Sequence, residues 1–187
     1  MVFSYKKILL PYDGSKPSAN ALQQAIHIVN DLFACRRETT NSIQGEESFE
    51  IILLHVVEEI HVRFPNMYIG LRMLAGKPLK VFFKEVYEEM RNEASKMLED
   101  TKKRLESAIK IDRDNKSKVL SLSVTVISQV VIGNPAQVII DVANNKQKVD
   151  LIIMGSTGLR GFSKVRALGS VSRHVCENAN CPVMLVH

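Results

Sequence analysis

Glycine and hydroxyl residues gather in one short stretch near the end of the 187-residue chain. Four of its nine glycines fall between Gly155 and Gly169, and Ser170 follows directly. Glycine has no Cβ, so a backbone rich in it can turn sharply and approach a ligand closely. A helix that begins near Gly169 would add unpaired N–H groups, which attract anions. The stretch predicts a site for a phosphate chain, with a plain surface turn and a serine helix cap as the alternative.

The stretch does not match two widespread phosphate motifs. Its glycines from Gly155 to Gly161 are spaced GxxGxxG rather than GxGxxG, and the chain holds no GxxxxGK[ST]. Their absence argues against a P-loop ATPase and against the usual dinucleotide loop. The side chains that would add donors or positive charge are Ser156, Thr157, Ser170, Ser172, Arg160, Lys164 and Arg166.

A second polar group, Asp13-Gly14-Ser15, follows the first apolar segment of the chain. The carboxylate of Asp13 can meet a ligand, or it can cap the turn that follows it. Ser15 is a suitable helix N-cap, and Pro17 is tolerated in a first helical turn. Ligands of open parallel sheets bind outside the carboxyl ends of the strands. We therefore expect Asp13 and the stretch after Gly155 to form the ligand site.

Alternating apolar strands and amphipathic helices must position these residues. Their order, β-α-β-α-β-α-β-α-β, predicts one α/β domain over residues 1–187, built on an open parallel five-stranded sheet with helices on both faces. Asn134 is expected to cap the third helix, with Pro135 at its first position. The expected strands are 6–12, 49–57, 122–126 with an extension to 132, 149–154 and 182–186, and the expected helices are 15–33, 81–109, 135–145 and 170–178.

Two segments interrupt this alternation. Residues 35–48 lose the helical period and turn polar, which predicts a surface insert. Residues 58–80 are irregular and contain two prolines and two glycines, which predicts a lid or a long loop. The methionine and aromatic stripe of the 81–109 helix is interpreted as core packing rather than as part of a cofactor site.

The composition excludes several classes of protein. With 45% hydrophobic and 24% charged residues, the chain has the proportions of a soluble globular domain. It has neither an apolar run of about 20 residues nor a signal-peptide core, so we expect no membrane insertion and no secretion. The three cysteines form no CxxC pair and no zinc spacing, which favours the reducing cytoplasm. The net charge of +5 is spread among acidic residues, which argues against nucleic acid as a partner.

The chain resembles the universal stress protein family, in its ATP-binding branch, over nearly its whole length. Each shared segment is weak evidence by itself, whereas all of the segments together, in this order, are specific to the family. The family's nucleotide motif places nine residues between its second glycine and the final Gly-Ser, whereas ten residues, 159–168, stand there in this chain. The segments that carry the resemblance are Lys6-Lys7-Ile8-Leu9, Asp13-Gly14-Ser15, Leu54-His55-Val56-Val57, Gly133-Asn134-Pro135, Asp150 to Ser156, Gly169-Ser170-Val171-Ser172 and Asn180-Cys181-Pro182-Val183.

The resemblance implies a Rossmann-like fold, similar to that of the adenine nucleotide alpha hydrolases, and a bound ATP. By resemblance, the phosphates and ribose are held by Gly155, Gly158, Gly169, Ser170 and Val171. Asp13 hydrogen-bonds the nucleotide or helps to order Mg²⁺. Val56 and Met154 line the adenine by the same comparison, although both also suit ordinary strand-end packing. The implied ATP-binding residues are Pro11, Asp13, Val56, Met154, Gly155, Ser156, Gly158, Gly169, Ser170 and Val171.

The resemblance also implies a homodimer that pairs through the last strand, 182–186. The leading hypothesis is a nucleotide-responsive stress protein without a catalytic residue. The second is a slow ATPase or phosphotransferase at the same site, for which Asp13 is the nearby base, and His174, a turn further along the helix, is interpreted as a surface histidine rather than as a base. The third is a dimerising interaction module that has lost nucleotide binding. The extra residue in the 159–168 spacer suggests this hypothesis.

Overall fold

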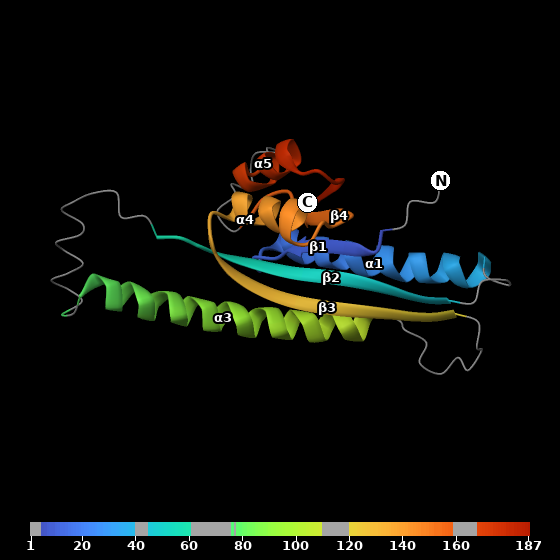
Figure 1. Cartoon of the computed structure of the whole chain (residues 1–187), viewed down its shortest axis with the longest axis horizontal. Coiled ribbons are helices and arrows are strands. Elements are labelled where there is room, and N and C mark those ends of the chain that lie inside the picture. The colour runs from blue at the N-terminus through green and yellow to red at the C-terminus, as the bar shows by residue number, and fades with distance from the viewer. Residues whose placement is uncertain (1–4, 40–44, 61–75, 77, 110–119, 159–167) are drawn as a thin grey trace.

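A parallel five-stranded sheet forms the centre of the molecule (Figure 1). The computed structural model describes residues 5–39, 45–60, 76, 78–109, 120–158 and 168–187. The strand order is β3-β2-β1-β4-β5, with every neighbouring pair parallel, which confirms the predicted fold class. The strands are β1 (Lys7–Pro11), β2 (Gly45–Glu58), β3 (Leu120–Gly133), β4 (Leu151–Gly155) and β5 (Val183–Val186).

Helices cover both faces of the sheet, as the alternation predicts. Helices α1 and α3 pack on one face, and α4 and α5 pack on the other (Figure 1). None of the helices among the described residues is long and apolar enough to cross a lipid bilayer. The helices are α1 (Lys16–Thr39), α3 (Leu79–Ala108), α4 (Pro135–Asp141), which continues as the π-helix η1 (Val142–Lys146), and α5 (Ser170–Asn178).

The central strands are apolar throughout because both of their faces are buried. In β1, Ile8 and Leu10 pack under α1 and α3, whereas Leu9 packs under α4 and α5. Successive side chains of a strand point to opposite faces, so a strand with two covered faces shows no polar alternation. The other central strands repeat this division, and the residues Ile51 to Leu54 of β2 are at most 1% exposed.

Two predicted helix caps are confirmed. The Ser15 hydroxyl accepts a hydrogen bond of 3.3 Å from the backbone N–H of Ser18, at the start of α1. The side-chain oxygen of Asn134 accepts one of 3.1 Å from the backbone N–H of Gln137, with Pro135 at the first position of α4. Both caps satisfy N–H groups that the helix itself leaves without an acceptor.

The predicted insert at 35–48 is wrong at both of its ends. Helix α1 continues through Thr39 and β2 begins at Gly45, so of the predicted insert only residues 40–44 lie outside the described part of the chain. The first residues of β2 pair with β3 alone, from Gly45 opposite Leu120 onward. This extension of the ladder lies beyond the centre of the sheet and does not require an apolar sequence.

The ends of the other helices and strands differ less from the predicted positions. The third helix continues past the predicted stop at Asn144-Asn145 as the π-helix, and α3 begins two residues earlier than predicted, at Leu79. Strand β2 ends at Glu58, and residues 61–75 and 77 of the predicted long loop lie outside the described residues. Helix α5 has the predicted bounds.

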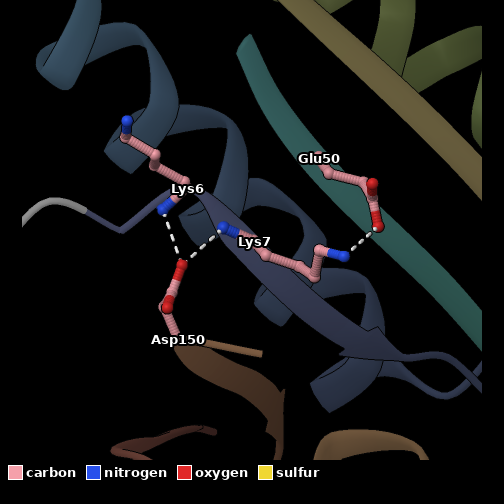
Figure 2. Close-up of polar contacts among 4 residues, drawn as sticks. All are labelled: Lys6, Lys7, Glu50 and Asp150. Atoms are coloured by element: carbon pink, nitrogen blue, oxygen red, sulfur yellow. Dashed lines mark hydrogen bonds and ion pairs between the residues drawn. The ribbon is translucent and has the colours of Figure 1, made fainter. Parts of the chain in front are cut away.

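A single carboxylate fastens the amino edge of the sheet (Figure 2). One oxygen of Asp150, just before β4, accepts hydrogen bonds from the backbone N–H groups of Lys6 at 2.9 Å and Lys7 at 2.8 Å. The Lys7 ammonium in turn forms an ion pair of 3.2 Å with Glu50 in β2. These contacts join the start of β1 to the start of β4 and to Glu50 within β2, on the side of the sheet opposite to the predicted ligand site.

Candidate functional site

A cavity of about 1050 Å³ opens at the carboxyl edge of the sheet, where β1, β2 and β4 end. The chain leaves β1 for α1 on one face and leaves β4 for α5 on the other. Such a switch point is where open parallel sheets bind their ligands. Nine of the ten predicted ATP-binding residues line this cavity: Pro11, Asp13, Val56, Met154, Gly155, Gly158, Gly169, Ser170 and Val171.

The loops after β1 and β4 meet inside the cavity. A Cβ built on Gly158 would lie only 2.9 Å from the Oδ2 atom of Asp13, so a larger residue would displace the carboxylate. The other oxygen of Asp13 accepts a hydrogen bond of 3.0 Å from the backbone N–H of Ser15. Asp13 therefore caps its own turn and also lies beside the glycine loop, so both of its predicted roles are compatible with its position.

Gly155 has a packing reason to be glycine. A Cβ at this position would lie 2.9 Å from the backbone of Pro17 and of Ser18, in the first turn of α1. Real Cβ atoms essentially never come so close to backbone atoms. The end of β4 and the start of α1 thus approach each other closely, which brings the two loops together.

The first turn of α5 supplies donors for an anion. Its N-cap is Gly169, which has no side chain to cap the helix, and no other described side chain does so. The backbone N–H of Arg173 donates to the Gly169 carbonyl at 3.0 Å. The N–H groups of Ser170, Val171 and Ser172 precede this bond, so they have no acceptor within the helix. Since these three residues line the cavity, the positive end of the helix dipole lies at the same place.

Ser156 lies behind the cavity rather than on its surface. It is only 1% exposed, and its hydroxyl is 2.8 Å from the Nδ1 atom of His187. Its carbonyl oxygen accepts hydrogen bonds from the Gly169 N–H at 2.9 Å and from the Ser172 hydroxyl at 2.7 Å. The structure thus places Ser156 where it holds the start of α5 against the end of β4.

One wall of the cavity is apolar. Val56 and Met154, the predicted adenine residues, belong to the hydrophobic cluster under α4 and α5, together with Leu54. His55 lies between Leu54 and Val56 on β2, and its Nδ1 atom is 2.8 Å from the carbonyl oxygen of Tyr12. A carbonyl only accepts hydrogen bonds, so the ring donates from Nδ1 and fixes the loop after β1. Sequence reasoning missed this contact because it joins segments more than 40 residues apart.

The described lining carries more negative than positive charge. Asp13, Glu58 and Glu93 line the cavity, and no lysine or arginine does so within the described residues. The predicted basic residues, Arg160, Lys164 and Arg166, lie outside the described residues, as does most of the ten-residue spacer. The part of the chain that the structure describes contains no group of three histidine, cysteine or acidic side chains arranged for a metal.

Other reactive side chains lie on or just after α5. His174, interpreted from the sequence as a surface histidine rather than a base, lines the cavity one turn into the helix. Cys176 and Cys181 do not line it, and burial raises the pKa of both thiols, with the nearby charges of Glu177 and Asp150 adding to the effect. A raised pKa keeps a thiol protonated and unreactive.

Helix α3 adds lining residues that the sequence interpretation assigned to the core. Leu98 and Leu105 are fully buried as expected, whereas Met90 and Met97 are half-buried and line the cavity with Glu93 and Ala94. The apolar period of this helix shows which stripe is inward. It does not show that the helix passes the end of the sheet, where the inward stripe meets a cavity.

Comparisons with known proteins agree with this architecture. The model of the universal stress protein family matches residues 4–187. The chain is 29% identical to universal stress protein MJ0531 of Methanocaldococcus jannaschii over 182 residues, which cover 97% of this chain and 82% of that protein. It is also 29% identical to universal stress protein YxiE of Bacillus subtilis over 183 residues, covering 97% and 99% of the two chains.

Solved structures share the same fold. The hypothetical protein MJ0577, whose biochemical function was assigned from its structure, superposes with a TM-score of 0.64 at 28% identity, over 97% of this chain and 95% of its own. Universal stress protein UspA from Lactobacillus plantarum superposes with a TM-score of 0.52 at 22% identity, over 98% of each chain.

Proposed function

The chain belongs to the universal stress protein family, and on that premise we propose that it binds ATP at the carboxyl edge of its sheet. The observation that carries this proposal is the uncapped first turn of α5, which enters the same cavity as the apolar wall and the Asp13–Gly158 contact. Phosphates would accept hydrogen bonds from the N–H groups of Ser170, Val171 and Ser172. The adenine would lie against Val56 and Met154, between apolar surfaces.

Relatives of the same fold support a nucleotide of this class. One structure, with a TM-score of 0.52 at 18% identity, is a universal stress protein in complex with cAMP. Another, from Arabidopsis thaliana, has AMP bound and superposes with a TM-score of 0.50 at 18% identity. At this identity the two complexes show only that the fold can accommodate an adenine nucleotide, and the residues of this chain must support the rest.

Mg²⁺ fits the chemistry of the site. It is bound in proteins through one or two carboxylates together with substrate phosphates. Asp13 is the carboxylate beside the glycine loop, where a Cβ on Gly158 would lie 2.9 Å from its Oδ2 atom. We infer that Asp13 helps to hold the Mg²⁺ of bound ATP.

The biological form that we propose is a cytoplasmic homodimer that responds to the nucleotide. Strand β5 has a neighbour on one side only among the described strands, and Met184 at its centre is 38% exposed. An open apolar edge invites pairing with another strand, which supports a dimer through this edge. A ligand that binds the folded dimer also stabilises it by mass action. The free thiols Cys176 and Cys181 suit a reducing compartment.

Two measurements test this function. The purified protein is examined by mass spectrometry for bound nucleotide and then titrated with Mg-ATP and Mg-GTP by calorimetry. We expect ATP to bind more tightly than GTP, because the apolar wall suits the adenine ring and α5 holds the phosphates. If the protein carries no bound nucleotide and shows no heat of binding at millimolar ATP, the proposal is overturned. That result would favour an interaction module without a nucleotide.

Slow hydrolysis of ATP is the second candidate function, because Asp13 and His174 both line the cavity. Hydrolysis needs a positioned water and stabilisation of the charge that builds up on the transferred phosphoryl group. Steady-state phosphate release by the wild type, Asp13→Ala and His174→Ala decides the question. Turnover that depends on either residue would support an enzyme, whereas phosphate release at the buffer rate would exclude it.

A further inference from the structure

The proposed nucleotide leaves one side of the cavity unused. Its phosphates are assigned to α5 and its adenine to Val56 and Met154. Helix α3 lines a different part of the same cavity with one stripe of the helix. The stripe consists of Met90, Glu93, Ala94 and Met97.

The two sides of the cavity belong to opposite faces of the sheet. Val56 and Met154 lie in the hydrophobic cluster under α4 and α5, whereas Met97 packs against the cluster under α1 and α3. The cavity therefore extends around the ends of the strands from one face to the other. Its volume of about 1050 Å³ reaches the upper end of the range of roughly 300–1,000 Å³ for small-molecule pockets. A nucleotide on the α5 side leaves room on the α3 side.

The α3 side is continuous with the nucleotide site. Gly14 follows Asp13 directly and has a φ of +80°, and a Cβ on it would lie 3.3 Å from the Sδ atom of Met97. The methionine stripe thus reaches the loop that carries Asp13. Along β2, Val57 and Glu58 follow the adenine residue Val56 and also line the cavity. The α3 side therefore adjoins both the Asp13 loop and the end of β2 that follows the adenine residue Val56.

The chemistry of this side defines its occupant. Met90, Ala94 and Met97 form an apolar surface, and methionine side chains adapt to ligands of different shape. Glu93 belongs to the same stripe and is exposed, so the rim of this side carries a carboxylate. We propose that the α3 side is a second subsite, which takes an apolar group extending from the adenine base and favours a terminal amine over a carboxylate. This proposal rests on the nucleotide function proposed above.

Base-modified nucleotides with one common linker length test the subsite. The full chain is titrated by calorimetry with Mg-ATP and with its N6-hexyl, N6-(6-aminohexyl) and N6-(5-carboxypentyl) derivatives. We expect the hexyl compound to bind about tenfold more tightly than ATP, since burial of a few methylene groups suffices for this gain. The amine should keep the gain because the Glu93 carboxylate lies at the rim, and the terminal carboxylate should lose it.

A matched pair of variants locates the effect. Met90→Gln puts a polar side chain of similar length into the stripe, and Val81→Gln makes a polar substitution at an exposed residue of the same helix, outside the cavity. The affinity ratio of hexyl-ATP to ATP should fall toward one in Met90→Gln and stay unchanged in Val81→Gln. Equal affinities of ATP and hexyl-ATP in the wild type, or a ratio insensitive to Met90→Gln, would overturn the subsite and leave the nucleotide site intact. Failure of ATP itself to bind would overturn the proposed function, and the subsite with it.

Discussion

Replacing two neighbouring glycines by alanine should separate a packing contact from a ligand contact. At Gly155 the new Cβ would lie 2.9 Å from backbone atoms of Pro17 and Ser18. Neither atom can rotate away, so the first turn of α1 must shift by several tenths of an ångström from its place over β4. Overpacking of this kind costs about 1–3 kcal/mol. Gly155→Ala should therefore lower the free energy of unfolding by about that amount.

At Gly158 the same change meets a side chain. The new Cβ would lie 2.9 Å from Oδ2 of Asp13, so the carboxylate must move by at least about 0.5 Å to reach an ordinary contact distance. The movement strains the hydrogen bond between Asp13 and the Ser15 N–H, which is worth about 1 kcal/mol. Gly158→Ala should thus destabilise the fold by at most about 1 kcal/mol. Because Asp13 would no longer be in place for Mg²⁺, we expect its affinity for Mg-ATP to fall about tenfold, or 1.4 kcal/mol.

Urea unfolding gives the two stabilities, and calorimetry with Mg-ATP gives the affinities. The decisive comparison in each variant is the loss of unfolding free energy against the loss of Mg-ATP affinity. Asp13→Asn is the control for the loss of the carboxylate charge. The reasoning would be refuted if Gly155→Ala unfolded at the wild-type urea concentration. It would also be refuted if Gly158→Ala bound Mg-ATP as tightly as the wild type.

Three further predictions concern other parts of the molecule. Asp150→Ala should lower the free energy of unfolding by about 1–2 kcal/mol in urea titrations, because two charge-assisted hydrogen bonds to the start of β1 are lost at a partly exposed site. Asp150→Asn, which keeps a neutral acceptor, should lose only part of this amount, and an Asp150→Asn variant as stable as the wild type would contradict the charge argument. Met184→Lys should convert the proposed dimer to monomers in sedimentation experiments, since it places like charges opposite each other at the paired β5 edges, whereas the equally exposed Leu168→Lys should not. Alkylation of Cys181 by iodoacetamide should be slower in the folded chain than in urea between pH 7 and 9, because its raised pKa lowers the thiolate fraction throughout that range. Equal rates in both states would show that burial does not protect this thiol.

The sequence predicted the elements well where the physical signal was local. The caps at Ser15 and Asn134 depend on residues within three positions of each other, and both are confirmed. The insert at 35–48 was mispredicted because the end of α1 and the start of β2 are polar. Polar residues can form a helix or strand when one side faces water, and the pairing partner of β2 lies 75 residues away.

The site was predictable as a group of residues rather than as a shape. Glycine spacing and the position of Asp13 indicated two loops at one edge, and Gly158 does lie beside Asp13. Ser156 has the residue type of a ligand contact, yet its neighbours in the fold, Ser172 and His187, use its polar atoms. The methionines of α3 have the period of a core stripe, and only the length of the helix relative to the sheet brings Met90 and Met97 to the cavity.

The sequence by itself determined the order of strands and helices, the parallel sheet with two covered faces, and the glycine loop that marks the carboxyl edge. These features depend on hydrophobic periodicity, capping and backbone freedom, which act between residues close together in the chain. The tertiary structure decided which loops meet, which hydroxyl is buried and which side of α3 faces the cavity. Such contacts join segments that are dozens of residues apart, and their geometry follows from the packing of layers that no local pattern specifies.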